Sequence, residues 1–314
     1  MNAMRALAVD TVNHRSRVIE VPRPVPGPGR ILVQIAVSAV NEMDVQVRAG
    51  GWASQVKGFR RAGPVLTGFE FVGTARTDGA RIRAGQRVIG YCHVLNGPRV
   101  HAEFACVDER DMVAIPDTLG DEAAAALVVM GLTAIEVLER IRPLTPGQRC
   151  LVIGAAGGVG AYAVQLAASR GARVTAICSA VNADWVGMQG ATEVRPYETE
   201  PRYRKGDRFD LILDAPAKSS FAEASPYLSR DGTFVSSNPT HDLGAFVRAA
   251  FGRKRAGWLM MLRTDPAKLA RLVALYEAGV LKPVIDSVFD VSNADAAFER
   301  FETRAKQGRV LLRL

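Results

Sequence analysis

A run of seven residues at 154–160, four of them glycine, limits the folds open to this chain more than any other feature. It directly follows the apolar residues 150–153 and precedes an apolar pattern with helical spacing at 161–168. The order of strand, glycine-rich turn and helix is typical of sites where backbone N–H groups at a helix N-terminus hold a dinucleotide pyrophosphate. An ordinary tight turn is the alternative. We predict pyrophosphate contacts from Gly154, Ala155, Ala156, Gly157, Gly158, Val159 and Gly160.

The second predicted strand, at 173–177, bears on which dinucleotide is bound. Sites that prefer NAD(H) usually place Asp or Glu about 20 residues beyond the first glycine, where the carboxylate binds the ribose 2′-hydroxyl. Residues 176–183 contain no acid, and Ser179 follows the strand. Because a hydroxyl with neutral neighbours tolerates a 2′-phosphate, we predict NADPH as the cofactor. The alternative is a strand end with no role in binding.

Composition excludes several classes of protein. The chain has 314 residues, of which 48% are hydrophobic and 23% charged, as in ordinary globular enzymes. Its formal charge of +8 includes no block of five like charges, and aromatic residues make up only 7%, so we expect no nucleic-acid partner. No apolar run reaches 18 residues, and residues 1–10 lack a secretory signal pattern. The widely spaced Cys92, Cys106, Cys150 and Cys178 suggest no disulfide framework, and we expect a cytoplasmic protein.

The chain changes character near residue 116. Before it, short β-like runs alternate with Gly and Pro turns, which indicates a compact β-rich domain. After it, strands alternate with helices, which predicts an α/β fold with a doubly wound parallel sheet. The tail from 284 has a strand, helix and strand pattern that we expect to return to the first domain. We therefore assign residues 1–116 and 286–314 to the β-rich domain and 117–285 to the parallel-sheet domain.

Six motifs in order resemble the medium-chain dehydrogenase/reductase superfamily, within which the chain is similar to the zinc-independent, ζ-crystallin-like quinone oxidoreductases. The resemblance covers nearly the whole chain. It implies a GroES-like β-rich N-terminal domain, a Rossmann domain and an active site between them. It also implies hydride transfer to a quinone or an α,β-unsaturated carbonyl acceptor, such as an enone or enoyl thioester. The motifs lie at 41–44, 68–73, 85–90, 131–133, 154–160 and 281–285.

The same resemblance bears on zinc. Zinc-dependent members carry Cys where this chain has Asn41 and His where it has Phe69, and they have a four-cysteine lobe that is missing here. A catalytic zinc needs about three protein ligands at one point, and only Glu70 remains. Adjacent strand residues point to opposite faces, which disfavours the one alternative ligand set. We therefore predict no metal site. The alternative set is Cys92, His93, His101 and Glu103.

The resemblance also implies the residues of the catalytic site. Asn41 and Asp44 would face the nicotinamide and substrate as catalytic residues, with Asn41 donating an amide N–H to the cofactor ribose or the substrate oxygen. The alternative is that both residues only cap a turn. The predicted substrate-binding residues are Gln46, Trp52, Phe69 and Trp258, and for Trp52 an anchor in a surface loop is equally plausible.

Further cofactor contacts follow by position from the family. These are Thr133, Ser179, Asn182, Tyr197, Ser236 and Arg304, and for Arg304 a solvated helix end is the alternative. Asn182 departs from the family, because many NADPH-specific relatives have a lysine there. Pro216 and Ala217 also depart, since they replace flexible positions near the nicotinamide ribose.

The apolar segment 257–262 follows the other strands of the second domain and is a candidate sheet edge. Because exposed apolar edge strands tend to pair with another chain, we expect a homodimer joined there. A strand buried inside one subunit is the alternative. Two other functions stay open: an NADPH-binding protein of the same fold with little catalysis, and an alcohol dehydrogenase-like enzyme with a displaced metal.

Overall fold

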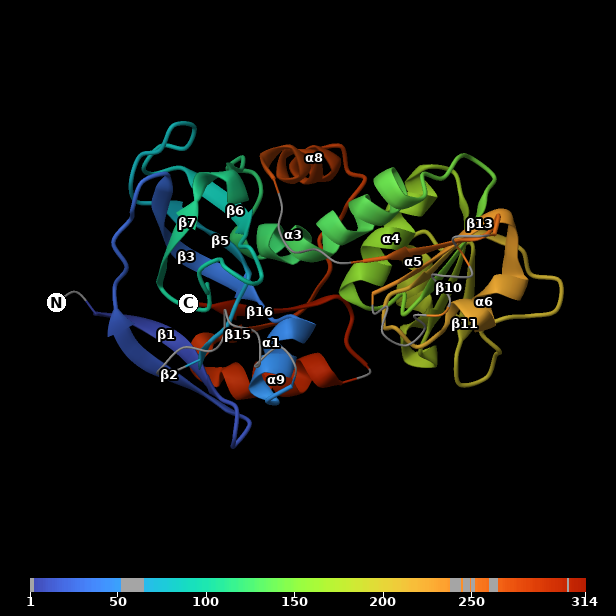
Figure 1. The fold of residues 1–314 in the computed structure, drawn as a ribbon, viewed down its shortest axis with the longest axis horizontal. Helices are drawn as coiled ribbons and strands as arrows, with labels where there is room; N and C mark the ends of the chain where they lie inside the picture. The colour runs from blue at the N-terminus through green and yellow to red at the C-terminus, as the bar shows by residue number, and fades with distance from the viewer. Residues whose placement is uncertain are drawn as a thin grey trace.

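The structure is a computed structural model that describes residues 3–51, 65–237, 244, 249, 252–259, 265–303 and 305–314. Figure 1 shows two lobes side by side, with helix α3 (Asp121–Ile135) running between them and the C-terminus in the same lobe as the N-terminal strands. Two predicted site residues, Trp52 and Arg304, lie outside the described residues.

The first lobe is built on a seven-stranded sheet with the order β15-β16-β3-β5-β6-β8, in which β7 also pairs with β3. The last two strands of the chain therefore complete the sheet of the first domain, and β16 lies antiparallel to β3. A hairpin of β1 and β2 packs beside this sheet and pairs with β4. The strands are β1 (Ala3–Asp10), β2 (Arg15–Pro22), β3 (Arg30–Ala39), β4 (Val65–Leu66), β5 (Glu70–Ala75), β6 (Arg87–Tyr91), β7 (Phe104–Asp108), β8 (Met112–Ala114), β15 (Ile285–Asp290) and β16 (Arg309–Arg313).

The second lobe contains a six-stranded parallel sheet with the order β11-β10-β9-β12-β13-β14. Numbered from its first strand this is 3-2-1-4-5-6, the order found in dinucleotide-binding domains. The expected fold class, a GroES-like β domain with a Rossmann domain, is confirmed. The strands are β9 (Arg149–Ile153), β10 (Arg173–Cys178), β11 (Glu193–Pro196), β12 (Phe209–Asp214), β13 (Leu228–Ser236) and β14 (Arg255–Trp258).

The helices cover the sheets and join the lobes. Helix α3 contacts β5 of the first lobe and α4 of the second, and it continues as a π-helical turn over Glu136–Ile141. One apolar cluster extends through both lobes, from Leu7 and Val37 to Val152. The two lobes thus share a core, which fixes their relative position. The remaining helices are α1 (Glu42–Arg48), α4 (Gly158–Ser169), α5 (Ala183–Met188), α6 (Phe221–Ala224), α8 (Pro266–Glu277) and α9 (Ala294–Glu302).

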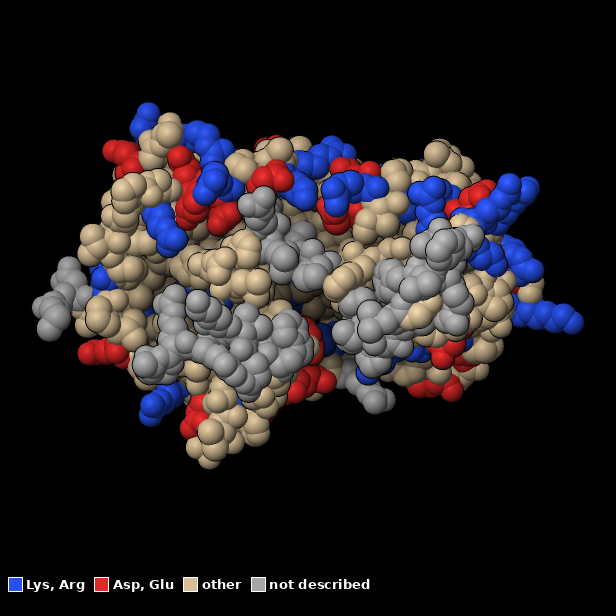
Figure 2. All heavy atoms as spheres, viewed as in Figure 1, with Lys and Arg blue, Asp and Glu red and all other residues tan. Residues whose placement is uncertain are grey.

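Strand β14 forms one edge of the parallel sheet. It covers only the start of the predicted edge segment, since residues 260–264 lie outside the described part of the chain. Among the described helices, none is long and apolar enough to cross a membrane. On the face shown in Figure 2, acidic and basic side chains are interspersed, so this face presents no continuous basic stripe of the kind that follows a nucleic acid backbone.

Candidate cofactor and active site

The carboxyl ends of the parallel strands meet at one edge of the sheet. The strand register aligns Ile153 with Ile177 on one side and with Asp214 on the other, and Asp214 with Ser236. Ligands of open α/β sheets bind just outside this edge, where the strand order reverses. The glycine-rich turn follows β9 at that reversal, so the sequence motif lies where the fold places its ligand.

The glycine turn has the geometry that close approach to a phosphate requires. Gly154 adopts a φ of +76°, in the left-handed region that favours glycine. A Cβ on Gly160 would lie 2.2 Å from the carbonyl oxygen of Gly154, so this glycine is needed for packing. A Cβ on Gly157 would meet only that same oxygen, at 3.4 Å, and would otherwise fill space beside the turn. Gly157 is the N-cap of α4, which places the helix N-terminus beside that space.

The C-terminal segment packs against this turn and places the side chain of Arg309 beside it, a residue that the sequence analysis did not predict for the site. The N–H of Gly308 donates to the carbonyl of Ala156 at 2.9 Å. The next residue, Arg309, is 2% exposed, and a Cβ on Gly158 would lie 3.0 Å from its Cδ. The buried Nε of Arg309 has no hydrogen-bond partner. A guanidinium with a spare donor beside a glycine turn suits an anionic pyrophosphate.

Arg309 also joins a buried polar cluster with Asn41 and Glu70. Its Nη2 forms an ion pair with Glu70 Oε1 and donates to Asn41 Oδ1 at 3.1 Å. Asn41 Nδ2 donates to Glu70 Oε1 at 2.9 Å and to the carbonyl of Ala39 at 3.1 Å. Glu70 Oε2 accepts from the N–H of Val129 at 2.7 Å. Burial raises the pKa of Glu70, which the charge of Arg309 and these donors oppose.

Both amide hydrogens of Asn41 are therefore engaged within the protein. The role predicted for Asn41 as donor to the cofactor or substrate stays a prediction, because it would require the amide to exchange one of these two partners. In the geometry seen here, Asn41 orients Glu70 and Arg309.

Asp44 is fully buried and binds backbone N–H groups. Its Oδ2 accepts from Asn41 at 2.9 Å, and its Oδ1 accepts from Gly68 at 2.8 Å. Burial raises the pKa of Asp44, although the nearby His101 and the two N–H donors act in the opposite direction. Asp44 thus ties the start of α1 to the turn before β5, which supports the capping alternative. A catalytic role for Asp44 stays a prediction.

The end of β10 holds two buried polar side chains with unused hydrogen-bonding atoms. Ser179 is 6% exposed and its Oγ has no partner, and Asn182 is 1% exposed and its Nδ2 has none. Asn182 Oδ1 accepts from Gln307 Nε2 at 3.0 Å, which links the second lobe to the C-terminal segment. Unused buried polar atoms need partners, and the ribose of a dinucleotide would supply them at this edge.

The structure places the other predicted cofactor residues as follows. Thr133 lies inside α3, and its Oγ1 donates to the carbonyl of Val129 at 2.7 Å. Tyr197 follows β11 and is 47% exposed, and Ser236 is buried at the end of β13. Ser236 and Tyr197 thus lie at the edge where the sheet binds its ligand, while the Thr133 hydroxyl is already bonded within its helix.

The predicted substrate residues lie on several elements. Gln46 is on α1, where its Nε2 donates to Glu42 at 3.3 Å while its buried Oε1 has no partner. Phe69 is 2% exposed and lies under the guanidinium of Arg99, 4.9 Å from the ring centroid. Trp258 ends β14 beside Ser236 and is 45% exposed. Their part in substrate binding stays a prediction.

The turn after β12 contains Pro216 and Ala217, the two residues that depart from the family pattern. Ala217 has a φ of 53°, a left-handed conformation in which glycine is usual. The carboxylate of Asp214 stabilises this turn by accepting from the N–H groups of Lys218 at 3.1 Å and Ser219 at 2.6 Å. Pro216 packs against Gly154, whose added Cβ would lie 2.8 Å from the proline Cδ. This turn therefore lies beside the glycine motif.

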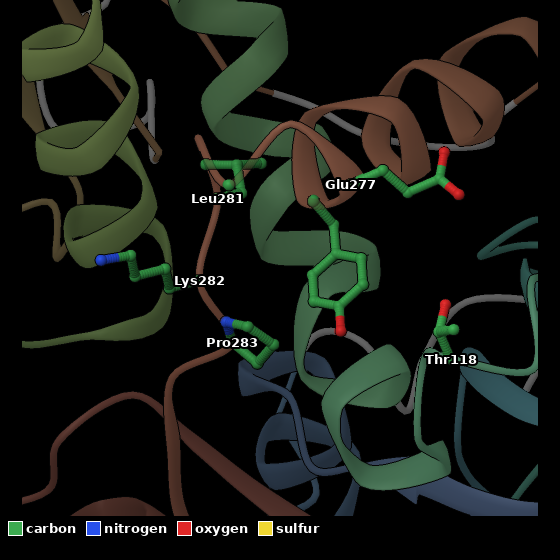
Figure 3. Close-up of a pocket in the computed structure, with 7 residues that line it drawn as sticks. Thr118, Glu277, Leu281, Lys282 and Pro283 are labelled. Atoms are coloured by element: carbon green, nitrogen blue, oxygen red, sulfur yellow. The ribbon is translucent and has the colours of Figure 1, made fainter.

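A surface hollow of about 350 Å³ lies elsewhere, at the C-terminal end of α8. Figure 3 shows Thr118, Glu277 and Lys282 around it, together with Leu281 and Pro283. None of the predicted site residues lines it, so we do not assign it to the active site. The described residues also contain no group of three or more His, Cys, Asp or Glu side chains that could hold a metal ion.

Comparisons with known proteins decide the family. Residues 27–117 match the family described as the alcohol dehydrogenase GroES-like domain, and residues 189–312 match the family described as zinc-binding dehydrogenase. The chain belongs to the medium-chain dehydrogenase/reductase superfamily. The first match lies in the first lobe, and the second runs from the parallel sheet into β15 and β16 of the first lobe. This medium-chain dehydrogenase/reductase has an NAD(P)-binding fold.

Similar proteins of this superfamily include named reductases. A chloroplast envelope quinone oxidoreductase homolog of Arabidopsis thaliana is 28% identical over 310 residues, which cover 94% of this chain and 92% of the relative. A trans-enoyl reductase, pgmF, of Aspergillus terreus is 25% identical over 316 residues, 92% of this chain and 87% of the relative. The solved quinone oxidoreductase from Coxiella burnetii has the same fold, with a TM-score of 0.90, 23% identity and full coverage of both chains.

Proposed function

We propose that this protein is a zinc-independent, NADPH-dependent oxidoreductase that delivers hydride to a quinone or an α,β-unsaturated carbonyl compound. The observation that carries the proposal is the state of Glu70, the one carboxylate among the three residues Asn41, Phe69 and Glu70 at the zinc position. Glu70 is already bound by Arg309, Asn41 and the N–H of Val129, while Phe69 offers no ligand atom. This donor set does not fit zinc.

The arrangement fits a dinucleotide. The glycine turn leaves space at Gly157, and the unused polar atoms of Ser179, Asn182 and Arg309 surround the sheet edge that receives the cofactor. NADPH is favoured over NADH because residues 176–183 contain no acid. Ser179 and Asn182 would contact the adenosine ribose, and Arg309 the pyrophosphate.

The residues at the site support an acceptor that is already electrophilic. Bound NADPH supplies the hydride. Without a metal to polarise an alcohol or ketone, the acceptor must itself be electrophilic, as quinones and enones are. Asn41 and Glu70 hold Arg309 in place, and Asp44 holds the backbone at Gly68. Gln46, Phe69 and Trp258 would border the acceptor. The named quinone and enoyl reductases among the relatives support both acceptor classes.

A turnover screen tests this function. NADPH and NADH are each mixed with the protein and a panel of quinones, enals, enones and enoyl-CoA esters, and cofactor oxidation is followed by absorbance at the nicotinamide band. We expect oxidation with at least one of these classes. Tight NADPH binding without oxidation by any acceptor would instead indicate a binding protein of the same fold.

Metal removal gives a second expected outcome. Because the donor set at Asn41, Phe69 and Glu70 does not fit zinc, activity should survive exhaustive chelation. Elemental analysis of the purified protein should find well under one zinc per chain. A stoichiometric zinc whose removal abolishes activity would contradict the proposal and favour an alcohol dehydrogenase-like enzyme.

We also propose a homodimer joined at the edge strand β14, in a cytoplasmic location. The four cysteines are free and buried, as is usual in a reducing compartment. Light scattering at micromolar concentration should give the dimer mass. Trp258→Lys should yield monomers, because lysine on an edge strand disfavours pairing, while Trp258→Phe should stay dimeric. A wild-type protein of monomer mass would refute this assembly.

A further inference from the structure

An acidic residue from the neighbouring strand lies at the end of β10, where the sequence pattern had indicated none. Glu198 comes two residues after β11, and its Oε2 accepts from the N–H of Ala180 at 3.0 Å. Ala180 directly follows Ser179 at the carboxyl end of β10. The Glu198 side chain is exposed, so a ligand at this edge can reach it.

The surroundings of this carboxylate are those of a ligand site. Ser179 Oγ and Asn182 Nδ2 have no partners, and both residues are more than nine-tenths buried. Glu198 binds the N–H of Ala180, which lies between Ser179 and Asn182 in the turn after the second strand of the sheet. At this place a dinucleotide-binding domain contacts the adenosine ribose, where a carboxylate binds a 2′-hydroxyl and a cation binds a 2′-phosphate.

The charge balance distinguishes Glu198 from the acids beside it. Glu193 pairs with Arg195 and Arg204, and Glu200 pairs with Arg204. Across the described residues, no ion pair involves Glu198. Position 182 holds a neutral Asn. A 2′-phosphate bound here would therefore meet an unneutralised carboxylate that also occupies the N–H of Ala180.

We propose that Glu198 determines how this protein discriminates between NADPH and NADH. Its carboxylate accepts a hydrogen bond from a ribose 2′-hydroxyl and repels a 2′-phosphate, so it narrows the preference for NADPH. The inference rests on the proposed dinucleotide cofactor and deepens it. In NAD(H)-selective domains an acid at the end of the second strand binds the ribose 2′-hydroxyl. Here Glu198, which follows β11, would have that role.

The test is a fluorescence titration of NADPH and NADH on the wild-type protein and Glu198→Gln. The substitution removes the charge but keeps the size of the side chain. We expect the ratio of the NADH to the NADPH dissociation constant to rise about tenfold, since one like charge near the phosphate is removed and one hydroxyl acceptor is weakened. Because Glu198 is exposed, the gain in NADPH affinity should shrink in 1 M salt.

Glu200→Gln is the matched control, because it removes one negative charge from the same segment while Arg204 keeps its pairing with Glu193. In this control, the ratio of the NADH to the NADPH dissociation constant should stay near that of the wild type. If Glu198→Gln leaves the ratio unchanged, or changes it no more than Glu200→Gln does, the role of Glu198 is refuted while the cofactor proposal stands. If neither cofactor binds the wild-type protein, the proposed function itself fails and this inference with it.

Discussion

Glu70→Ala should lower the free energy of unfolding by about 3–5 kcal/mol, the usual cost of removing one partner from a buried ion pair. The variant leaves the guanidinium of Arg309 2% exposed and without its carboxylate, and it also removes the acceptors for Asn41 and for the N–H of Val129. Denaturation in urea, followed by circular dichroism, measures the change.

Two comparisons isolate the cause of that loss. Glu122→Ala breaks the ion pair with Arg313, whose side chain is 63% exposed, and should cost no more than about 1 kcal/mol. The double variant Glu70→Leu with Arg309→Met removes both charges and should recover much of the stability. If Glu70→Ala were as mild as Glu122→Ala, the buried cluster would not contribute to stability as described.

Gly157→Ala should weaken NADPH binding about 30-fold, or about 2 kcal/mol, while leaving the fold intact. The added methyl group meets no protein atom closer than the Gly154 carbonyl oxygen at 3.4 Å, so the turn can accept it. The methyl would instead fill the space through which the pyrophosphate approaches the backbone. Fluorescence titration of NADPH gives the affinity, and thermal unfolding without cofactor gives the stability.

Two other glycines provide contrasts. Gly160→Ala forces its methyl against the backbone of Gly154 at 2.2 Å, so it should lower stability as well as binding. At Gly187 an added Cβ has no atom within 4 Å, so Gly187→Ala should change neither. Unchanged NADPH affinity in Gly157→Ala would place the cofactor away from this turn.

The features that follow from local pattern could be predicted from the sequence. The predicted strands at 150–153 and 173–177 lie within β9 and β10, and the predicted alternation of strands and helices continues after them. Apolar runs between turns carry this information locally. The glycine turn follows from the same pattern, whereas β14 begins two residues before the predicted edge segment at 257–262. The hairpin of β1 and β2 did not follow, since β2 is only partly buried and its pattern is weak.

The partners of individual site residues could not be predicted, because they are distant in sequence. Arg309 lies 239 positions from Glu70 in the sequence. Only the folded chain shows that the guanidinium of Arg309 pairs with the carboxylate of Glu70. A basic residue beginning the apolar strand β16 was the one available signal. Glu198 could not be predicted for a related reason. An acid was expected just after β10, whereas the carboxylate that reaches this place belongs to a residue after β11.

The return of the chain to its first domain constrains the order in which the protein can fold. The parallel sheet uses strands from one continuous stretch, 149–258, so all its pairings are available before the last residues are synthesised. Strand β3, in contrast, pairs with β5 on one side, while its other edge along residues 37–39 gains its described partner only when 311–313 emerge. Because domains generally fold as units during synthesis, the second lobe can fold first, while the sheet of the first lobe still has one unpaired edge at β3. The step that closes this edge also brings Arg309 to Glu70 and Gly308 to the glycine turn, so a nascent chain forms this buried polar cluster only when β16 emerges.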